Sequence, residues 1–276
     1  MLKSCQKIIM ISDPQIDFGI DNGKHESNIL EKCFQNMEGD IITICGDITE
    51  KGLSEEWDRF YYLLTKYSNI KELIIAPGNM DNVCNDLGKE QYLNKYNLFS
   101  YKNIKNLYYS YKMENITIIS ISPEMDDNPS ISINQLTFIE ENIKEASERN
   151  IPVIILSHYQ LKDTINVDWK YAHLGEESMS IKKILYKYNV KILFCSGHIH
   201  RGLIKDNNGS IAIVKNVTYL SVPSICKPDI EHYKADNEDK GTGYIIDIHK
   251  KTLQINGYDF LNNKYLDNFC WKTELN

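Results

Sequence analysis

The sequence predicts an α/β protein in which two β-sheets pack face to face as a β-sandwich, with helices flanking them on the outside. Apolar, β-branched runs of strand length alternate with helical patterns as far as residue 200, and their near-continuous apolar character indicates strands covered on both faces. In the last third, such runs follow one another through short connections, as in hairpins. With 276 residues, 42% of them hydrophobic, we expect a single domain over residues 1–276.

The expected strands are short runs rich in Ile, Val and Leu. In the first part of the chain they are residues 7–12, 40–45, 72–77, 115–122, 152–157 and 191–196. In the last third they are residues 217–224, 242–249 and 252–259.

Three helices have clear patterns. One begins at Ser54, because acidic residues fill its first turn and an apolar stripe follows, made of Trp57, Phe60, Tyr61 and Leu64. Another begins at Ser132, where Gln135 is expected to complete a capping box, and its stripe consists of Ile133, Leu136, Ile139, Ile143 and Ala146. The third is expected around residues 180–188.

Composition and charge exclude several classes of protein. The net charge of −7 disfavours a protein that coats nucleic acid backbones, so no bulk nucleic-acid binding is expected. No run approaches the roughly 18 apolar residues of a membrane helix, and the first apolar run ends at Asp13, too early for a signal peptide. The seven cysteines are odd in number and contain no CxxC pair, which favours a reducing, cytoplasmic location.

Polar side chains follow five of the predicted strands directly. In chain order they are Asp13, Asp47, Asn79, His158 and the pair His198 and His200. In open α/β sheets the carboxyl ends of the strands are the usual site of binding crevices, so these side chains are expected to line one pocket.

Each of these residues has an ordinary structural explanation by itself, because an Asp after a strand is usually a turn residue and a lone His usually packs. Five coincidences at one edge are much harder to explain by turn chemistry. Carboxylates bind hard divalent ions, imidazoles suit Zn²⁺, Fe²⁺ and Mn²⁺, and Asn supplies a neutral oxygen. Two such ions about 3.5–4 Å apart can clamp a phosphate and deprotonate an attacking water. The absence of Cys from the set argues against structural zinc.

The motifs resemble the signature of the calcineurin-like metallophosphoesterases, which reads Asp-x-His, Gly-Asp, Gly-Asn-His-Asp, His and Gly-His-x-His. In this chain the matching residues are Asp13-x-Gln15, Gly46-Asp47, Gly78-Asn79-x-Asp81, Ser157-His158 and Gly197-His198-x-His200. The resemblance spans residues 13 to 200, and the two-sheet sandwich that it implies agrees with the pattern of apolar runs.

By this resemblance the chain holds two divalent ions, with Mn²⁺, Fe²⁺ or Zn²⁺ expected. One ion would be held by Asp13, Gln15, Asp47 and His200, and the other by Asp47, Asn79, His158 and His198, with Asp47 bridging. The resemblance also implies a catalytic set of Asp47, Asn79, His158 and Asp81.

The chain departs from the family signature twice. Gln15 stands where the family has His, and its carbonyl oxygen is a weaker ligand that favours a harder ion such as manganese. Met80 stands where the family has a His that binds phosphate or protonates the leaving oxygen, and a thioether can do neither. Loss of general acid help typically costs about 10²–10⁴-fold in rate.

Three further residues are candidates for binding substrate. His25 and His173 are expected in loops from which each could reach the site, although both have the simpler explanation of ordinary loop histidines. Arg201 could meet a phosphate as a planar donor, and the equally good alternative is a solvated loop arginine.

The leading hypothesis is a metal-dependent phosphatase or phosphodiesterase that acts on a small-molecule or nucleotide phosphoester. A nuclease is an alternative, but the acidic balance and the lack of a basic stripe count against it. A second alternative is a metal- or ligand-binding module in which Met80 and Gln15 mark lost catalysis. The sequence does not indicate an oligomeric state.

Overall fold

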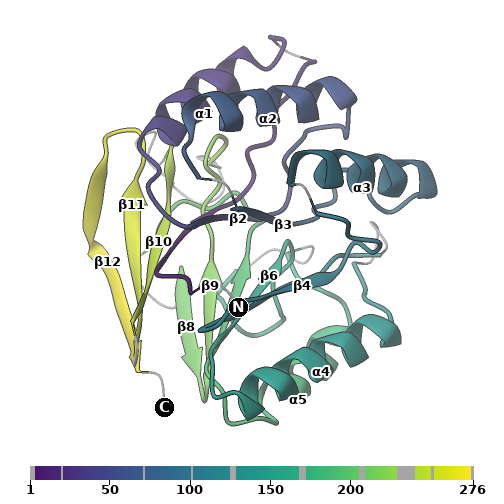
Figure 1. The fold of residues 1–276 in the computed structure, drawn as a ribbon, viewed down its shortest axis with the longest axis vertical. Helices are drawn as coiled ribbons and strands as arrows, with labels where there is room; N and C mark the ends of the chain where they lie inside the picture. Colours follow the sequence, from purple (N-terminus) through teal and green to yellow (C-terminus); the bar gives the residue numbers. More distant parts are fainter. Residues whose placement is uncertain are drawn as a thin grey trace.

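The computed structural model describes most of the chain and contains two six-stranded sheets. It describes residues 4–19, 21–70, 72–100, 102–124, 129–167, 172–204, 209–228, 240–249 and 252–274. The sheets lie face to face between helices, with α1, α2 and α3 on one side and α4 and α5 on the other (Figure 1). The predicted fold class, a two-sheet sandwich flanked by helices, is therefore confirmed.

The first sheet combines three parallel strands with an antiparallel extension. Strands β1, β2 and β3 are parallel, and β10 joins β1 antiparallel to start a meander of three strands. In spatial order the strands are β12 (Lys264–Glu274), β11 (Thr252–Asp259), β10 (Thr242–His249), β1 (Lys7–Ile11), β2 (Ile41–Cys45) and β3 (Glu72–Ala76).

The second sheet has a parallel centre and antiparallel strands at both ends. Strands β5, β6, β7 and β9 are parallel, whereas β4 and β8 pair antiparallel with their neighbours. In spatial order the strands are β4 (Tyr109–Lys112), β5 (Thr117–Ser120), β6 (Val153–Ser157), β7 (Ile192–Ser196), β9 (Val217–Ser221) and β8 (Ile211–Val214). Contacts of β2 and β3 with β5 and β6 join the two sheets.

The helices bury their apolar stripes, with local differences from the sequence predictions. They are α1 (Lys24–Gln35), α2 (Ser54–Tyr67), α3 (Asp86–Ser100), α4 (Ile133–Glu148) and α5 (Glu177–Leu185). The stripe predicted for α2 is buried as expected. Helix α5 begins about one turn earlier than residue 180. At α4 the hydroxyl of Ser132 caps the helix, but Ile133 is 80% exposed.

The predicted capping box at α4 is wrong. The Gln135 side chain bonds the backbone N–H and C=O of Ser122 and also the carboxylate of Glu124, so it does not reach back to Ser132. The amide therefore ties the helix to the segment after β5, a tertiary contact that the local sequence pattern did not predict.

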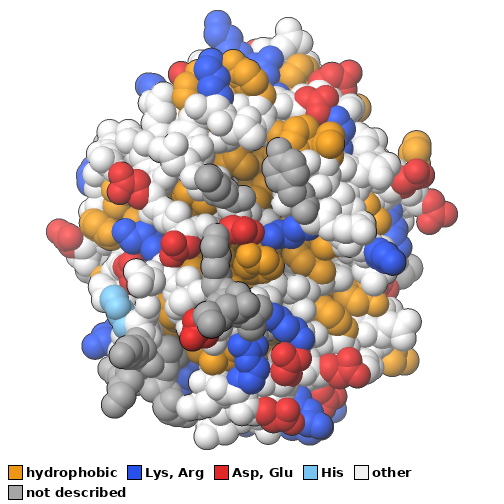
Figure 2. Space-filling view, viewed as in Figure 1, with side chains coloured by type: hydrophobic (Ala, Val, Ile, Leu, Met, Phe, Trp, Pro, Cys, Tyr) orange, Lys and Arg blue, Asp and Glu red, His pale blue; other side chains and the backbone are white. Residues whose placement is uncertain are grey.

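The edge of the first sheet at β12 is irregular, and the face shown in Figure 2 carries charges of both signs. At β12, the outermost strand of the first sheet, the pairing with β11 shifts register between Asn256 and Tyr258, which interrupts the ladder. Acidic and basic side chains are interspersed over the face shown in Figure 2. None of the described helices combines the length and the apolarity that crossing a membrane requires.

Candidate metal centre

The candidate centre is built at the carboxyl ends of parallel strands in both sheets. Asp13, Asp47 and Asn79 follow β1, β2 and β3, while His158 and His198 follow β6 and β7. The two sheets meet at this edge, because the Nδ1 atom of His158 lies 2.8 Å from the carbonyl oxygen of Cys45 at the end of β2. The prediction that these side chains share one edge is thus met by the geometry.

Two clusters of acidic and imidazole side chains form there and share one residue. Asp47, His158 and His198 make one cluster, and Asp13, Asp47 and His200 make the other. In each cluster the potential ligand atoms all lie within 4.8 Å of one another. Asp47 belongs to both, which is the arrangement that a bridging carboxylate between two ions requires.

At the first cluster, three ligand atoms lie around Nε2 of His158, and one of them is the amide oxygen of Asn79. This Nε2 lies 3.1 Å from an oxygen of Asp47, 3.0 Å from the amide oxygen of Asn79 and 3.1 Å from Nδ1 of His198. A carbonyl oxygen can only accept, so the contact with Cys45 places the proton on Nδ1 when the imidazole is neutral. The Nε2 lone pair then points to the other ligands.

The second cluster leaves buried oxygen atoms without hydrogen-bond partners. Oδ1 of Asp13 and Oε1 of Gln15 are both buried and have no such partner, although His200 Nε2 approaches Asp13 Oδ1 to 3.4 Å. Unpaired buried oxygens are costly, and a metal ion is one partner that removes the cost. Because the donor set is oxygen and imidazole, the residues present fit a divalent cation.

Backbone strain concentrates on the predicted ligands. Asp13, Gln15, Asp47, His198 and His200 all have positive φ, between 44° and 72°. Residues other than glycine rarely adopt this region, and such strain persists only where the surrounding structure enforces it. Five of the seven predicted ligands are therefore held in conformations that serve the position of their side chains.

The glycines before the ligands are required by close approach between loops. A Cβ atom on Gly46, which has φ of 91°, would lie 2.3 Å from Nδ1 of His158. A Cβ on Gly78 would lie 2.0 Å from a carboxylate oxygen of Asp47, and one on Gly197 would lie 1.9 Å from the Ser12 hydroxyl. Glycine thus lets the loops of both sheets pack against the ligand side chains.

Without metal ions, the centre holds protons shared between acids and imidazoles. Burial lowers the pKa of His158, but the carboxylate of Asp47 outweighs burial and raises the pKa to about 9. In the same way, burial lowers the pKa of His200, but the Asp13 carboxylate raises it by more, so the pKa is raised overall. The Asp13 pKa is lowered, because His200 outweighs burial. Imidazolium ions therefore supply the positive charge that these carboxylates need.

The comparisons with known proteins agree with this geometry. The model of the calcineurin-like phosphoesterase family matches residues 6–202. The chain belongs to the calcineurin-like phosphoesterase family. The resemblance to this family is confirmed, and family membership supports metal-dependent hydrolysis of phosphoesters in general.

Among solved structures, a dimetal phosphatase from Danio rerio matches with a TM-score of 0.65 at 10% identity, covering 99% of each chain. GAP50, the anchor in the inner membrane complex of Plasmodium, matches with a TM-score of 0.61 at 10% identity, covering 99% of this chain and 89% of that one. These likenesses concern the fold alone. No curated protein matches this phosphoesterase chain.

Asp81 is fully buried beside the predicted ligands of this phosphoesterase. Its carboxylate accepts hydrogen bonds from the backbone N–H of Gly78 and from the N–H and hydroxyl of Thr49. Burial and the nearby charge of Asp47 raise the pKa of Asp81 to about 7. Thr49 was not a candidate from the sequence, and no local pattern marks it, because its partner lies 32 residues further along the chain.

The predicted substrate-binding residues lie in different settings. His25 is exposed and sits in the first turn of α1, not in a loop. His173 is half-buried in a bridge with Gln160, and burial lowers its pKa. Arg201 is buried, and Nη1 donates to the carbonyl oxygens of Asn166 and Gly209, so the alternative of a solvated arginine is wrong.

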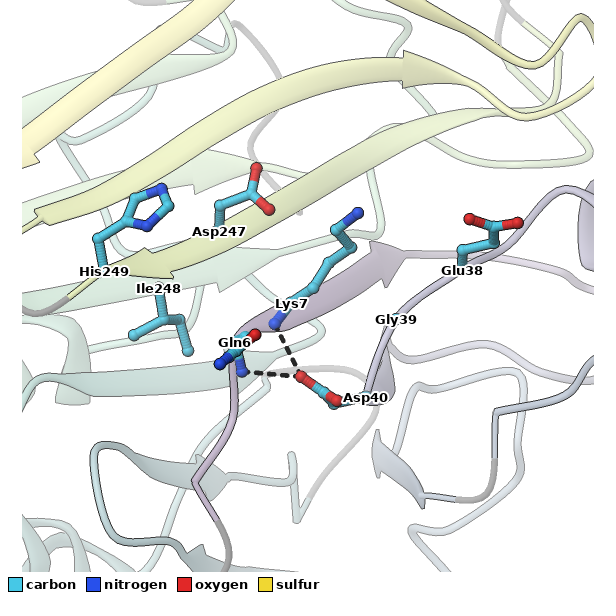
Figure 3. A pocket seen from close by; sticks show the side chains of 8 residues that line it. All are labelled: Gln6, Lys7, Glu38, Gly39, Asp40, Asp247, Ile248 and His249. Carbon is cyan, nitrogen blue, oxygen red and sulfur yellow. Dashed lines mark hydrogen bonds between the residues drawn. The ribbon is translucent and has the colours of Figure 1, made fainter.

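A pocket of about 550 Å³ lies away from the predicted ligands. Lys7, Asp40, Asp247 and His249 are among its lining residues, from the amino ends of β1 and β2 and the end of β10 (Figure 3). The Asp40 carboxylate accepts from the backbone N–H groups of Gln6 and Lys7. None of the predicted metal ligands lines this pocket, so it is separate from the candidate metal centre.

Proposed function

We propose that this phosphoesterase hydrolyses a phosphate monoester or diester of a small molecule or nucleotide with the help of two divalent ions. The observation that carries the proposal is the pair of acid and imidazole clusters that share Asp47. The buried oxygens of Asp13 and Gln15 that lack a hydrogen-bond partner add to it, because they provide ligand atoms for an ion.

In this proposal Asp13, Gln15, Asp47 and His200 hold one ion, and Asp47, Asn79, His158 and His198 hold the other. When bound, such ions supply a Lewis acid for the phosphoryl oxygens and lower the pKa of a water. Mn²⁺, Fe²⁺ and Zn²⁺ all suit the donor set, and the amide oxygen of Gln15 favours a harder ion such as Mn²⁺ at its site.

The protein itself contributes placement and proton control. The positive φ values of the ligands and the glycine contacts fix the side chains before substrate arrives. The Cys45 carbonyl holds the proton of His158 on Nδ1, which keeps Nε2 available as a ligand. These features reduce the reorganisation that binding and reaction require.

The site has no clear group to donate a proton to the leaving group among the candidates considered. Met80 offers a backbone N–H, which donates to Asp47, and a thioether that cannot donate. Among the other candidates, Arg201 bonds two backbone carbonyls and His173 has a lowered pKa, so neither is a ready proton donor at neutral pH. We therefore propose substrates whose leaving groups depart without protonation, such as aryl or phosphoryl groups.

The second candidate function is a binding module without turnover. Met80 and Gln15 favour it, and the fold also occurs in a Plasmodium protein described as an anchor. The strained ligand geometry fits both functions, because each of them holds ions, so turnover of an ester is what separates the two.

Metal analysis and a substrate panel test the proposal together. Purified protein should contain or take up divalent ions and hydrolyse one or more of a monoester, a diester and a cyclic nucleotide when Mn²⁺ is added. Asp47→Asn should lower the metal affinity by more than roughly 10–100-fold, which is the typical cost of losing a group that only contacts a metal ligand. A matched control is Asp40→Asn, a carboxylate at the opposite strand ends. Ion binding without hydrolysis of any ester would favour the binding module instead.

A further inference from the structure

A buried carboxylate joins the two loops that carry the shared ligand and the amide ligand. Oδ1 of Asp81 accepts from the backbone N–H of Thr49 at 3.1 Å and from its hydroxyl at 2.9 Å. Oδ2 accepts from the backbone N–H of Gly78 at 3.0 Å. Thr49 is two residues after Asp47, and Gly78 is directly before Asn79. One side chain therefore contacts both loops next to their ligands.

A second contact runs between the same loops in the opposite direction. The backbone N–H of Met80 donates to Oδ1 of Asp47 at 2.9 Å. The loops are also in close contact at Gly78, where a Cβ would lie 2.0 Å from that Asp47 oxygen. The Thr49 hydroxyl in turn accepts from the N–H of Gly52 at 3.2 Å, so the end of the β2 loop is held as well.

These contacts give Asp81 a task that does not need a histidine at position 80. Three donors already occupy the carboxylate, and all three belong to Thr49 and Gly78. We propose that Asp81 is a positioning residue, which holds Asp47 and Asn79 in register across the two loops and so sets the affinity for the ion that both of them contact. This inference rests on the proposed function only for the identity of the ligands.

Substitution of Asp81 by Asn breaks the arrangement with little change in volume. Whichever way the amide is turned, its NH₂ group faces either the N–H of Gly78 or the donors of Thr49, so at least one contact becomes donor against donor. Loss of an outer partner of a metal ligand typically costs 10–100-fold in metal affinity. We expect this loss of affinity at the site that uses both Asp47 and Asn79. The loss should be smaller at the site that uses Asp47 without Asn79.

The test is a calorimetric titration of the metal-free protein with Mn²⁺. Wild type should show two unequal affinities, and Asp81→Asn should weaken one of them by about 10–100-fold. Thr49→Val keeps the backbone N–H contact with Asp81 and removes the hydroxyl contacts with Asp81, Met80 and Gly52. It should therefore weaken the same site by less, and Thr49→Ser should weaken it less than Thr49→Val. The double variant Asp81→Asn/Thr49→Val should cost less than the sum of the single ones, since both remove one shared interaction.

Tyr96→Phe is the matched control for a general loss of stability. It removes a buried hydroxyl that donates to the carbonyl of Leu73 at the start of β3, away from both loops. It should leave both Mn²⁺ affinities unchanged while lowering the unfolding midpoint. Where Asp81→Asn does not fold, the Thr49 pair carries the same test.

The outcomes separate this inference from the proposed function. The positioning role would be overturned, and the proposed function left intact, if folded Asp81→Asn kept wild-type affinity at both sites. Where Asp81→Asn does not fold, wild-type affinity in Thr49→Val would have the same meaning. Mn²⁺ binding that responds to Asp81 as expected, in a protein that hydrolyses no ester, would support the positioning role and reject the proposed function. A wild type that binds no divalent ion would overturn both.

Discussion

Metal binding at the centre should depend steeply on pH, because the ion must displace a proton. Asp47 raises the pKa of His158 to about 9 in the metal-free protein, and a ligand nitrogen must be unprotonated to bind. At pH 7 only about one molecule in 100 has a neutral His158, which weakens the apparent affinity about 100-fold, or roughly 3 kcal/mol. The affinity should rise about tenfold per pH unit between 7 and 9 and level off above 9.

The metal affinity should depend more steeply on pH in the range where His200 titrates. Its pKa is also raised, by Asp13, so a second proton leaves when the other site fills. The assay is a competition titration of Mn²⁺ against a chromophoric chelator from pH 6.5 to 9.5, with proton release measured by an indicator dye. Replacement of His173 by Gln serves as the control and should leave the slope unchanged, since that residue belongs to neither cluster.

An affinity that stays constant between pH 7 and 9, after correction for the chelator, would refute this reasoning. It would mean that His158 is neutral in the metal-free protein and that Asp47 has another partner there.

Three further predictions follow from the same geometry. Metal-free protein should lose stability as pH rises from 6.5 to 9, by up to roughly 3 kcal/mol in denaturant unfolding. The His158 pKa is higher in the folded protein, so protonated His158 stabilises the fold fully below the pKa that it has in the unfolded chain. This stabilisation is lost as pH rises through the pKa of the folded protein. Gly46→Ala should lower Mn²⁺ affinity by more than about 10-fold in a folded protein, because the new Cβ displaces His158, whereas Gly39→Ala at the other strand ends should not. Met80→His should speed hydrolysis of alkyl esters more than of nitrophenyl esters, by about 10²-fold, and an unchanged leaving-group dependence relative to Met80→Leu would show that no proton is needed.

The size of the Met80→His effect is limited by what Asp81 already does. The family resemblance implies a catalytic role for Asp81, which follows the position where the family has its His. In the structure its oxygens accept from Thr49 and Gly78, so an introduced imidazole would compete with the loop contacts. We therefore expect a gain at the low end of the general-acid range.

The sequence was most informative where strands end. Parallel strands place their carboxyl ends at a common edge, so Asp13, Asp47 and Asn79 could be brought together without knowledge of distances. The same rule placed His158 and His198 just after the ends of two further strands, which the structure shows to be β6 and β7 of the second sheet. That the two edges meet was implied by the family resemblance and became visible only in the contact between His158 and Cys45.

Other features were not predicted. Helix α1 was missed, and with it the place of His25, although its start has a local signal in Asp21, whose carboxylate accepts from the N–H groups of Lys24 and His25. Strand β12 mixes charged, polar and aromatic residues without regular alternation, and its register shift agrees with that irregular pattern. The contact of Thr49 with Asp81 joins two loops, which a reading of either loop cannot show.

The extent of the chain as a single domain and its cytoplasmic location stay predictions. No disulfide joins any of its seven cysteines, all of which lie in the described residues. Their thiols are mostly buried, and burial raises the pKa of Cys5 to about 12.

The central claim is that two ions share Asp47. The most direct measurement is a crystal structure of Mn²⁺-soaked protein, with anomalous diffraction used to locate the ions. We expect two anomalous peaks, both within coordination distance of Asp47. One should lie next to Asp13, Gln15 and His200, and the other next to Asn79, His158 and His198. A single peak, or two peaks of which only one contacts Asp47, would contradict the claim.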